Sequence, residues 1–262
     1  MVYYFDSILI FIYLCTNRRV MKDSENLYDK IRELIGKAPG NLNIMEEIID
    51  VDLQVEYFES SKRVAEKYDD DWALSQISSL SDPDYSLDDK KQLLARLATT
   101  EDVKAFRAIE SFMEDPDKGL REWGILALQE SKMHLESNLL EENQVFISTG
   151  LGGKNNKLRY FVVLISRNSE VFTDFQQKIL EEEFPFVIQK YDGDVEEFEI
   201  SGYLASCLLL LPIHLTVKEV FSEGIEECNQ FGDFLRETCI VTNVKRLTFG
   251  EVEEFIEKRE KK

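Results

Sequence analysis

Apolar positions in residues 22–140 recur at the spacing of α-helices. One helix is predicted to end near Pro39-Gly40, and a longer helix is predicted over residues 43–68. Another helix is expected to begin at the three aspartates of residues 69–71, because a helix N-terminus favours negative charge. The pattern therefore predicts an all-α first half.

Two further helix starts are indicated by an S/T-x-x-D pattern. Ser86 stands three residues before Asp89, and Thr99 stands three residues before Asp102. In such a pair the first hydroxyl accepts a hydrogen bond from the backbone N–H of the acidic residue, whose side chain can reach back. We therefore expect one helix that begins just after Ser86 and a second helix, "VKAFRAIESFM", that follows Thr99 and Asp102.

A repeat of 33 residues runs through the same half. The stretches "SSLSDPDYSLDDKKQLLARL" and "SFMEDPDKGLREWGILALQ" align, with matches at Ser78/Ser111, Asp82/Asp115, Pro83/Pro116, Asp84/Asp117, Leu87/Leu120 and Leu93/Leu126. A period of this size is typical of stacked helix pairs. In the second copy, Asp115 is expected to cap a helix and Pro116 to occupy its first position.

The second copy resembles the HEAT-type helical repeat. That unit often opens with Asp-Pro, carries an arginine a few residues later and then small and leucine positions, and Asp115-Pro116, Arg121, Ala127 and Leu128 stand in those places. The resemblance covers residues 78–136. It implies an α-solenoid fragment, a fold commonly used for protein binding, and it implies no catalytic residues.

Three residues of this half are candidates for contact with a partner, namely Trp123, Arg121 and Trp72. Trp123 has two interpretations. It is either a buried residue in the spine of the repeat or an exposed residue on a concave face, where aromatic side chains dominate binding energy.

After residue 141 the apolar pattern changes to that of strands. The runs "QVFISTG" and "KLRYFVVLIS" are β-rich and are predicted to form a hairpin through "LGGKNN". The run "VEEFEISGYLASCLLLLPI" is either one long strand or a hairpin around Ser201-Gly202, and "ETCIVTNV" is a short strand. Asp192-Gly193 marks a turn between elements.

Three helices in the second half are predicted from capping boxes. The pairs are Thr173 with Gln176, Thr216 with Glu219, and Thr248 with Glu251. The first of these helices either stops near Pro185 or continues through it to Tyr191, since proline usually kinks or ends a helix. The resulting order, β-β-α-β-α-β-α, predicts a sheet with helices on a face.

The predicted fold class is α+β in two domains. Residues 21–140 are expected to form a HEAT-like helical domain and residues 141–262 an α/β sandwich. Residues 1–20 form an apolar extension that we interpret as non-native or translated from upstream. A short membrane anchor, or a strand or helix packed on the domain, are the alternatives. Its run of 13 apolar-rich residues, "YYFDSILIFIYLC", is too short to span a bilayer as a helix.

The charge of the chain limits its partners. The formal net charge is −20, and it is divided between residues 1–140 (28 acidic, 17 basic) and residues 141–262 (23 acidic, 14 basic). Such a surface repels phosphate, so nucleic-acid binding and binding to anionic membranes are disfavoured. A basic protein would be attracted, and its association would weaken with salt.

The four cysteines, Cys15, Cys207, Cys228 and Cys239, do not form a disulfide framework or a C-x-x-C pair. The simplest expectation is a reducing cytoplasm. Cys207 and His214 could in principle form a nucleophile pair, but a thiol in an apolar strand is more often buried and inert. Two further cysteines without nearby histidines do not make a zinc site.

Two other stretches invite a functional interpretation. The loop "GLGGKNNK" at residues 150–157 lacks the strand-to-helix context of a phosphate loop, and a hairpin is expected. Neighbouring aspartates at residues 69–71 point about 100° apart on a helix, so they do not converge on one cation. No catalytic residue, metal site or cofactor is therefore predicted.

The function predicted from these patterns is a non-enzymatic, cytoplasmic adaptor that binds another protein through its helical half, and the net charge favours a basic partner. The second half would supply another surface or a homodimer contact. Two alternatives remain. One is an acidic immunity or inhibitor protein that neutralises a basic partner. The other is an enzyme whose site, formed by Cys207, His214 or the hairpin loop, lies in a cleft beside the sheet.

Overall fold

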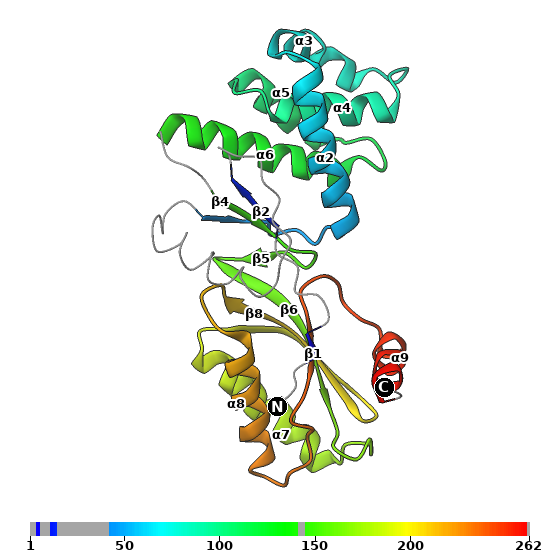
Figure 1. Ribbon diagram of the computed structural model, residues 1–262, viewed down its shortest axis with the longest axis vertical. Helices are drawn as coiled ribbons and strands as arrows, with labels where there is room; N and C mark the ends of the chain where they lie inside the picture. The colour runs from blue at the N-terminus through cyan, green and yellow to red at the C-terminus, as the bar shows by residue number, and fades with distance from the viewer. Residues whose placement is uncertain (1–3, 6–10, 15–41, 141–144, 261–262) are drawn as a thin grey trace.

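The computed structural model describes residues 4–5, 11–14, 42–140 and 145–260, and it combines helices with a mainly antiparallel sheet (Figure 1). This confirms the mixed α and β content of the predicted fold class. The described part of the helical half contains α2 (Val51–Lys67), α3 (Asp70–Ser75), the 3-10 turn η1 (Ile77–Ser81), α4 (Leu87–Ala98), α5 (Val103–Glu114) and α6 (Arg121–Leu140). The helix predicted before Pro39-Gly40 lies outside the described residues.

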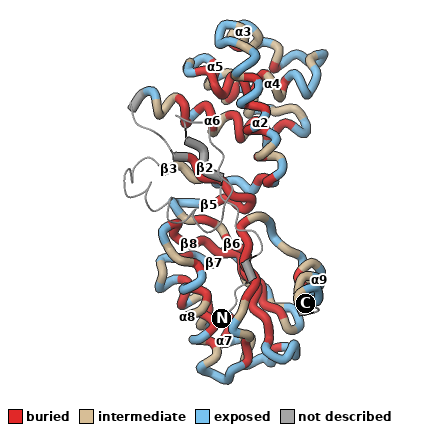
Figure 2. The backbone as a smooth tube through the Cα atoms, in the orientation of Figure 1, coloured by how far each residue is buried: buried red, intermediate tan, exposed pale blue. Residues whose placement is uncertain are grey.

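The helices pack around α4. This helix contacts α2, α3, α5 and α6. Residues 93–100 are all buried, and they form much of the continuous red core of this half in Figure 2. The apolar core includes Leu93, Leu94 and Leu97 from α4, together with Tyr57 from α2 and Trp123 from α6. Because the second half of α4 is buried among four other helices, its close-packed side chains constrain the positions of its neighbours.

The helix predicted over residues 43–68 is shorter than expected. Its first residues form β3 (Leu42–Ile44), which pairs in parallel with the strand at Val145–Ser148. The helix proper begins only at Val51, after Asp50, whose carboxylate accepts hydrogen bonds from the backbone N–H groups of Asp52 and Leu53. Backbone pairing to a strand about 100 residues away has overridden the local helical spacing.

The predicted helix start at Asp115-Pro116 is wrong. Asp115 is instead the C-cap residue of α5, and α6 begins at Arg121. The connection turns at Gly119, whose φ of +92° is a conformation that other residues rarely adopt. Its Asp117 carboxylate pairs with the buried Lys90 ammonium of α4 at 2.7 Å. Both Asp-Pro pairs of the repeat therefore lie in connections rather than at a first helical turn.

The capping predictions have mixed outcomes in the helical half. Ser86 caps α4 as predicted, because its hydroxyl accepts from the Asp89 N–H at 3.1 Å and donates to the Asp89 carboxylate. The prediction for Thr99 is wrong, since the residue that caps α5 is Asp102. Thr99 is instead the C-cap of α4, where it accepts a hydrogen bond from Arg96. The Thr99 hydroxyl therefore binds the buried guanidinium of Arg96, three residues earlier, instead of capping the next helix.

The second half is built on a six-stranded sheet of order β1-β9-β6-β8-β7, with β5 paired to β6. Its elements are β1 (Tyr4–Phe5), β5 (Gly153–Lys154), β6 (Lys157–Ile165), α7 (Asp174–Lys190), β7 (Asp194–Ser201), β8 (Leu204–Pro212), α8 (Val217–Asn229), β9 (Ile240–Thr242) and α9 (Phe249–Glu260). The run from β6 to β9 has the order β-α-β-β-α-β, with β8 between β6 and β7. This is the ferredoxin-like arrangement of a split β-α-β unit.

Helices cover both faces of this sheet. The helices α7 and α8 lie side by side on one face, and α9 lies on the other (Figure 1). The larger core, under α7 and α8, includes Tyr160, Phe184 and Leu209. The smaller core, under α9, includes Phe161, Leu208 and Val252. Because both faces are covered, β8 is buried along its whole length and reads as a continuous apolar run.

The hairpin predicted after residue 141 was expected to pair the wrong strands. The strand β4 (Val145–Ser148) belongs to a separate three-stranded sheet of order β2-β4-β3, and the hairpin joins β5 to β6. Asn155 and Asn156 form its turn with φ values of 50° and 62°, the positive values that a tight hairpin requires. The turn residues were identified correctly, but the strand before them is only two residues long.

Several open alternatives in the second half are resolved. The run around Ser201-Gly202 is a hairpin of β7 and β8, and α7 continues through Pro185 to Lys190. Capping boxes are present at Thr173 and at Thr248. Thr216 stands at the N-cap of α8, but its side chain makes no capping hydrogen bond.

Part of the apolar N-terminal run is paired to both sheets. Tyr4–Phe5 forms β1 and pairs in parallel with β9, and β2 (Phe11–Leu14) pairs antiparallel with β4. These contacts match the alternative of a strand packed on the domain. Within the described ranges, no helix is long and apolar enough to cross a membrane.

Candidate functional site

The three residues predicted to contact a partner lie in different environments. Trp123 is only 2% exposed, so of its two interpretations the structure matches the buried residue and not the exposed partner contact. Its indole N–H donates to the Lys91 carbonyl at 2.9 Å, and its ring meets Tyr57 edge-on at 5.1 Å between centroids. Arg121 is exposed at the first turn of α6, and Trp72 is half-buried in α3. The structure therefore does not bring the three residues together.

Trp72 stacks on Tyr68 at the end of the helical half that is remote from the large sheet. The two ring centroids are 4.0 Å apart and the ring planes are inclined by 13°. The Lys67 ammonium lies 4.5 Å from the centroid of the Tyr68 ring. The stack is thus already in contact with one cation of the chain itself, which is the geometry of a cation–π interaction.

A third aromatic residue, Tyr85, borders this stack. Burial is the largest cause that raises the pKa of Tyr85, followed by the nearby Asp89 carboxylate and then Tyr68. Tyr68, Trp72 and Tyr85 are all half-buried, while Asp69 and Asp89 are exposed. We call these five residues the Trp72 patch.

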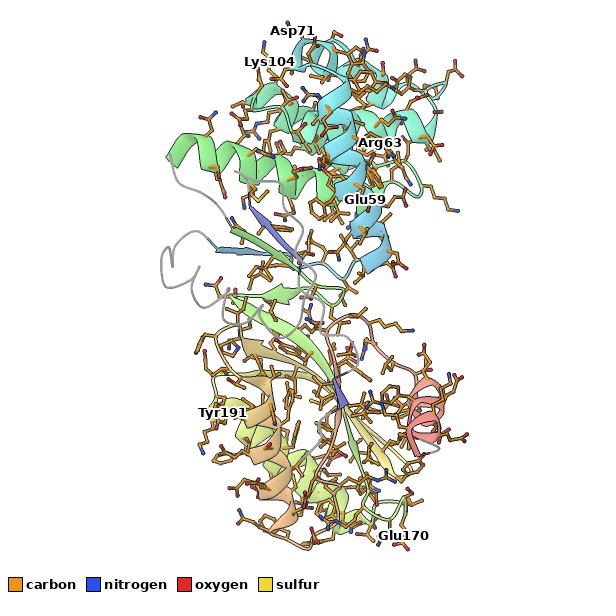
Figure 3. The ribbon with its side chains drawn as sticks, viewed as in Figure 1. Glu59, Arg63, Asp71, Lys104, Glu170 and Tyr191 are labelled. Carbon is orange, nitrogen blue, oxygen red and sulfur yellow. The ribbon has the colours of Figure 1, made fainter. Side chains whose placement is uncertain are left out.

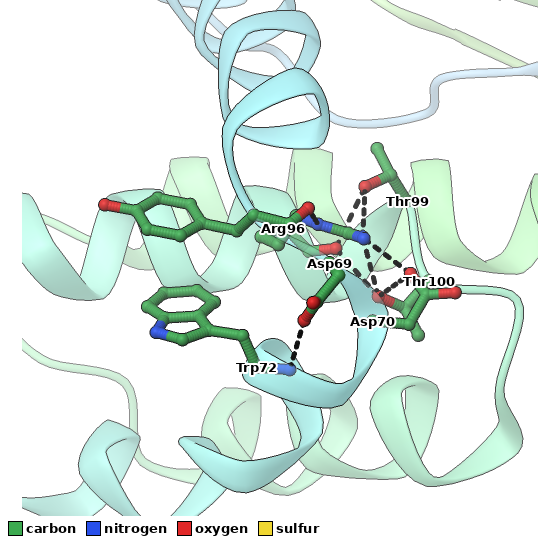
Figure 4. Close-up of polar contacts among 7 residues, drawn as sticks. Asp69, Asp70, Trp72, Arg96, Thr99 and Thr100 are labelled. Atoms are coloured by element: carbon green, nitrogen blue, oxygen red, sulfur yellow. Dashed lines mark hydrogen bonds and ion pairs between the residues drawn. The ribbon is translucent and has the colours of Figure 1, made fainter.

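The Trp72 patch rests on a network around Arg96 of α4 (Figure 4). The guanidinium is buried and donates to the Tyr68 carbonyl at 2.7 Å, to the Asp70 carboxylate at 2.5 Å, and to the hydroxyls of Thr99 and Thr100. One side chain therefore fixes the end of α2, the start of α3 and the end of α4. The planar fork of arginine can make these bonds together, whereas a lysine ammonium cannot.

The aspartates of residues 69–71 have separate roles, as their spacing predicts. Asp69 caps α3 by accepting from the Trp72 N–H at 2.7 Å, and Asp70 pairs with Arg96. Asp71 is exposed and lies at the tip of the helical half (Figure 3). Within the described ranges, no group of three or more acidic, histidine or cysteine side chains could hold a metal ion.

The surroundings of the patch are strongly acidic. Residues 68–89 contain seven aspartates and no lysine or arginine. Arg96 offsets the charge of Asp70, and the remaining six, Asp69, Asp71, Asp82, Asp84, Asp88 and Asp89, are exposed. A half-buried aromatic stack surrounded by carboxylates is chemically suited to a cationic side chain.

The thiols of the second half are buried in apolar surroundings. Cys207 is 1% exposed in the middle of β8, and burial raises its pKa far above the usual range. Burial also raises the pKa of Cys228 and of Cys239 to about 12. His214 is exposed beyond the end of β8, and the strand between Cys207 and Pro212 alone spans about 17 Å. This geometry does not bring a base to the Cys207 thiol.

The sheet half also has a shallow hollow of about 350 Å³ at the C-terminal end of α8. Its lining includes Arg167, Glu226, Asn229, Asp233 and Glu237. Arg167 is engaged by the Asp233 carboxylate at 2.6 Å and donates to the Leu235 carbonyl. Neither the hairpin loop nor Cys207 contributes to this lining, so the hollow does not match the cleft expected for the enzyme alternative.

Sequence reasoning did not identify Tyr68, Tyr85 or Arg96. Tyr68 and Tyr85 are 17 residues apart on different elements, and only the packing of α2 against α4 brings them together. The one available signal was the position of Trp72 directly after three aspartates, which is also an ordinary helix start.

Comparison with known proteins gives little further information. No protein-family model and no curated protein matches the chain. Among solved structures, the chain is similar to that of a candidate transposase from Deinococcus radiodurans R1. The sequence identity is 14%, the TM-score is 0.36, and the match covers 40% of this chain and 93% of that one. A similarity of this size carries no argument about function.

Proposed function

We propose that this protein is a non-enzymatic, cytoplasmic adaptor in two domains, whose HEAT-like helical domain binds a basic protein through the Trp72 patch. The observation that carries the proposal is the half-exposed Tyr68–Trp72 stack, held rigidly by Arg96 and surrounded by aspartates. The 33-residue recurrence of Asp-Pro before α4 and before α6 supports the helical-repeat interpretation.

The proposed mode of binding combines two interactions. A lysine or arginine of the partner would lie against the open side of the aromatic stack, as Lys67 already does on Tyr68. Neighbouring basic residues would then meet the exposed carboxylates of Asp69, Asp71 and Asp89. The aromatic contact supplies affinity and position, while the carboxylates accelerate association and make it sensitive to salt.

A direct titration tests this proposal. A labelled oligoarginine peptide is added to the full chain, and binding is followed by fluorescence anisotropy at low and at moderate salt. We expect saturable binding that weakens with salt, and we expect Trp72→Ala to weaken it by roughly 5- to 30-fold, the loss of about 1–2 kcal/mol. Trp72→Phe should retain most of the affinity, since it keeps an aromatic face.

The matched control is Val103→Ala, which removes an exposed apolar side chain from α5 of the same half. It should leave peptide binding unchanged. Capture from native lysate with the wild type and with Trp72→Ala then identifies the physiological partner as a basic protein retained only by the wild type. Equal binding by the wild type and Trp72→Ala would refute the assigned site, and no saturable binding at either salt concentration would refute the proposed function.

A further inference from the structure

The outward face of α7 carries two phenylalanines that its own packing does not use. Phe175 is 58% exposed and Phe186 is 64% exposed. They are 11 residues apart, which is three helical turns, so both lie on the same side of the helix. The inward side is formed by Ile179, Leu180, Phe184, Val187 and Ile188, which are buried against the sheet and α8.

Two opposite charges stand between the phenylalanines. Lys178 and Glu182 are exposed, and at about 100° per residue both fall within about 60° of Phe175 around the helix. The exposed stripe therefore reads Phe175, Lys178, Glu182, Phe186. From the N-terminal end the lysine comes before the glutamate, and from the C-terminal end the glutamate comes before the lysine.

This order is complementary to itself when two copies run antiparallel. A two-fold axis near residue 180 places Phe175 of one copy opposite Phe186 of the other, and Lys178 opposite Glu182. The midpoints of the two pairs, 180.5 and 180, differ by half a residue, which is less than about 1 Å along the helix. A two-fold interface requires such self-complementarity, because the same patch is used on both sides.

The helix is also held firmly in place for such a contact. Lys190, its last residue, forms an ion pair with Glu223 of α8. Tyr191, labelled in Figure 3, follows α7 and donates a hydrogen bond to the same carboxylate. Both contacts tie the C-terminal end of α7 to α8, so the stripe is presented on a fixed support.

We infer that the chain forms a homodimer through antiparallel pairing of α7 with α7 of a second copy. The four phenylalanines form an apolar contact at each end of this interface, and the two Lys178–Glu182 pairs between them fix its direction. A basic partner is a poorer occupant, because the one lysine and one glutamate of the stripe leave it no net charge to attract a basic surface. The interface is small, so a dissociation constant on the order of micromolar is expected. The inference does not depend on the proposed function, which uses the other half.

Sedimentation velocity over a range of concentrations at moderate salt tests the dimer. The wild type should shift from monomer to dimer as concentration rises, and the double variant Phe175→Ser/Phe186→Ser should remain monomeric. Phe231→Ser is the matched control, because Phe231 is also exposed but lies after α8 and outside the stripe. Circular dichroism confirms that each variant is folded.

Charge reversal tests the direction of pairing. Lys178→Glu alone places like charges opposite each other, and so does Glu182→Lys, so each should weaken self-association by roughly tenfold. The double variant K178E/E182K restores opposite charges and should restore the dimer. An equimolar mixture of the two single variants should form mixed dimers, since every pair across that interface is then Lys with Glu. A monomeric wild type at all concentrations, or a dimer indifferent to these reversals, would overturn the inference.

Discussion

The two halves of the molecule bury different kinds of polar side chain. Among the described residues, the buried charged side chains are Lys90, Arg96 and Glu130, and all three lie in the helical half. Each is engaged by partners of opposite charge or by hydroxyl groups, as when Tyr57 and Ser61 donate to Glu130. The buried polar residues of the sheet half, such as Ser206 and Asn243, are uncharged.

The difference shows how each half fixes its shape. In the sheet half, the cores on the two faces are apolar, and charge is kept on the edge strand β7, where Glu196 and Glu197 pair with Arg159 and Arg246. Charged edges of this kind prevent unwanted strand pairing. In the helical half, buried charges tie particular segments together, so a substitution there should change geometry as well as stability.

The largest effect is expected from the apolar core of the sheet half. Leu209 is fully buried in the middle of β8 and belongs to the core under α7 and α8. Leu209→Ala should lower the free energy of unfolding by about 2–5 kcal/mol, because it removes buried methyl groups and leaves a cavity. Urea denaturation measures this value. The exposed Leu87 supplies the control, and Leu87→Ala should cost less than about 0.5 kcal/mol.

A somewhat smaller effect is expected for Arg96→Lys, which keeps the charge but removes the planar guanidinium whose hydrogen bonds join α2, α3 and α4. We expect a loss of about 2–3 kcal/mol, since hydrogen bonds to a buried charged group are worth more than neutral ones. The same denaturation experiment applies, with Arg107→Lys on the exposed face of α5 as the control. If Arg96→Lys costs less than about 0.5 kcal/mol, buried charge does not organise the helical half and the contrast between the halves fails.

The sequence predicted local features better than distant ones. The helix starts at Ser86, Thr173 and Thr248 were predicted because their signals are complete within four residues. The strand at β3 was missed because its partner β4 lies about 100 residues away. At Thr99, the capping prediction failed although the competing Arg96 is only three residues away, because α5 begins at Val103 with Asp102 as its N-cap and leaves Thr99 at the end of α4.

The candidate site follows the same rule. Trp72 could be named from the sequence because it stands beside three aspartates, but its stack on Tyr68, which ends α2, and the position of Tyr85 near Tyr68 depend on how the helices pack. Trp123, the more prominent candidate, had two interpretations in the sequence, and only its contacts with α4 and α2 decide for the buried one. A site whose residues come from several elements can be identified only when the packing of those elements is known.

A loss of about 1 kcal/mol is expected for Asp69→Ala, which removes the N-cap of α3 and so loosens the short helix that carries Trp72. Asp71→Ala is the matched control. It removes a neighbouring carboxylate that affects only the helix dipole, worth a few tenths of a kcal/mol. Denaturation gives the free energies, and fluorescence quenching by iodide reports the exposure of Trp72. Equal effects of the two substitutions would contradict the capping role of Asp69.

The smallest effect concerns a surface charge of the sheet half, Glu251 in the first turn of α9. A hydrogen bond from Lys245 is the largest cause that lowers the pKa of Glu251 to about 2, and hydrogen bonds from Thr248 add to it. Because the folded-state pKa lies below the ordinary glutamate pKa of 4.5, the stabilisation is present above about pH 4.5 and is lost as the pH falls through about 2.

Carboxyl titration by NMR should therefore give Glu251 one of the lowest pKa values in the chain. Lys245→Met should raise it towards the ordinary range but not fully, because the Thr248 hydrogen bonds remain. Lys258→Met is the control, since Lys258 pairs with Glu254 rather than Glu251. If Lys245→Met leaves the Glu251 pKa unchanged, the low pKa comes from the Thr248 hydrogen bonds at the helix start alone. The surface ion pairs of the sheet half would then contribute little to its stability.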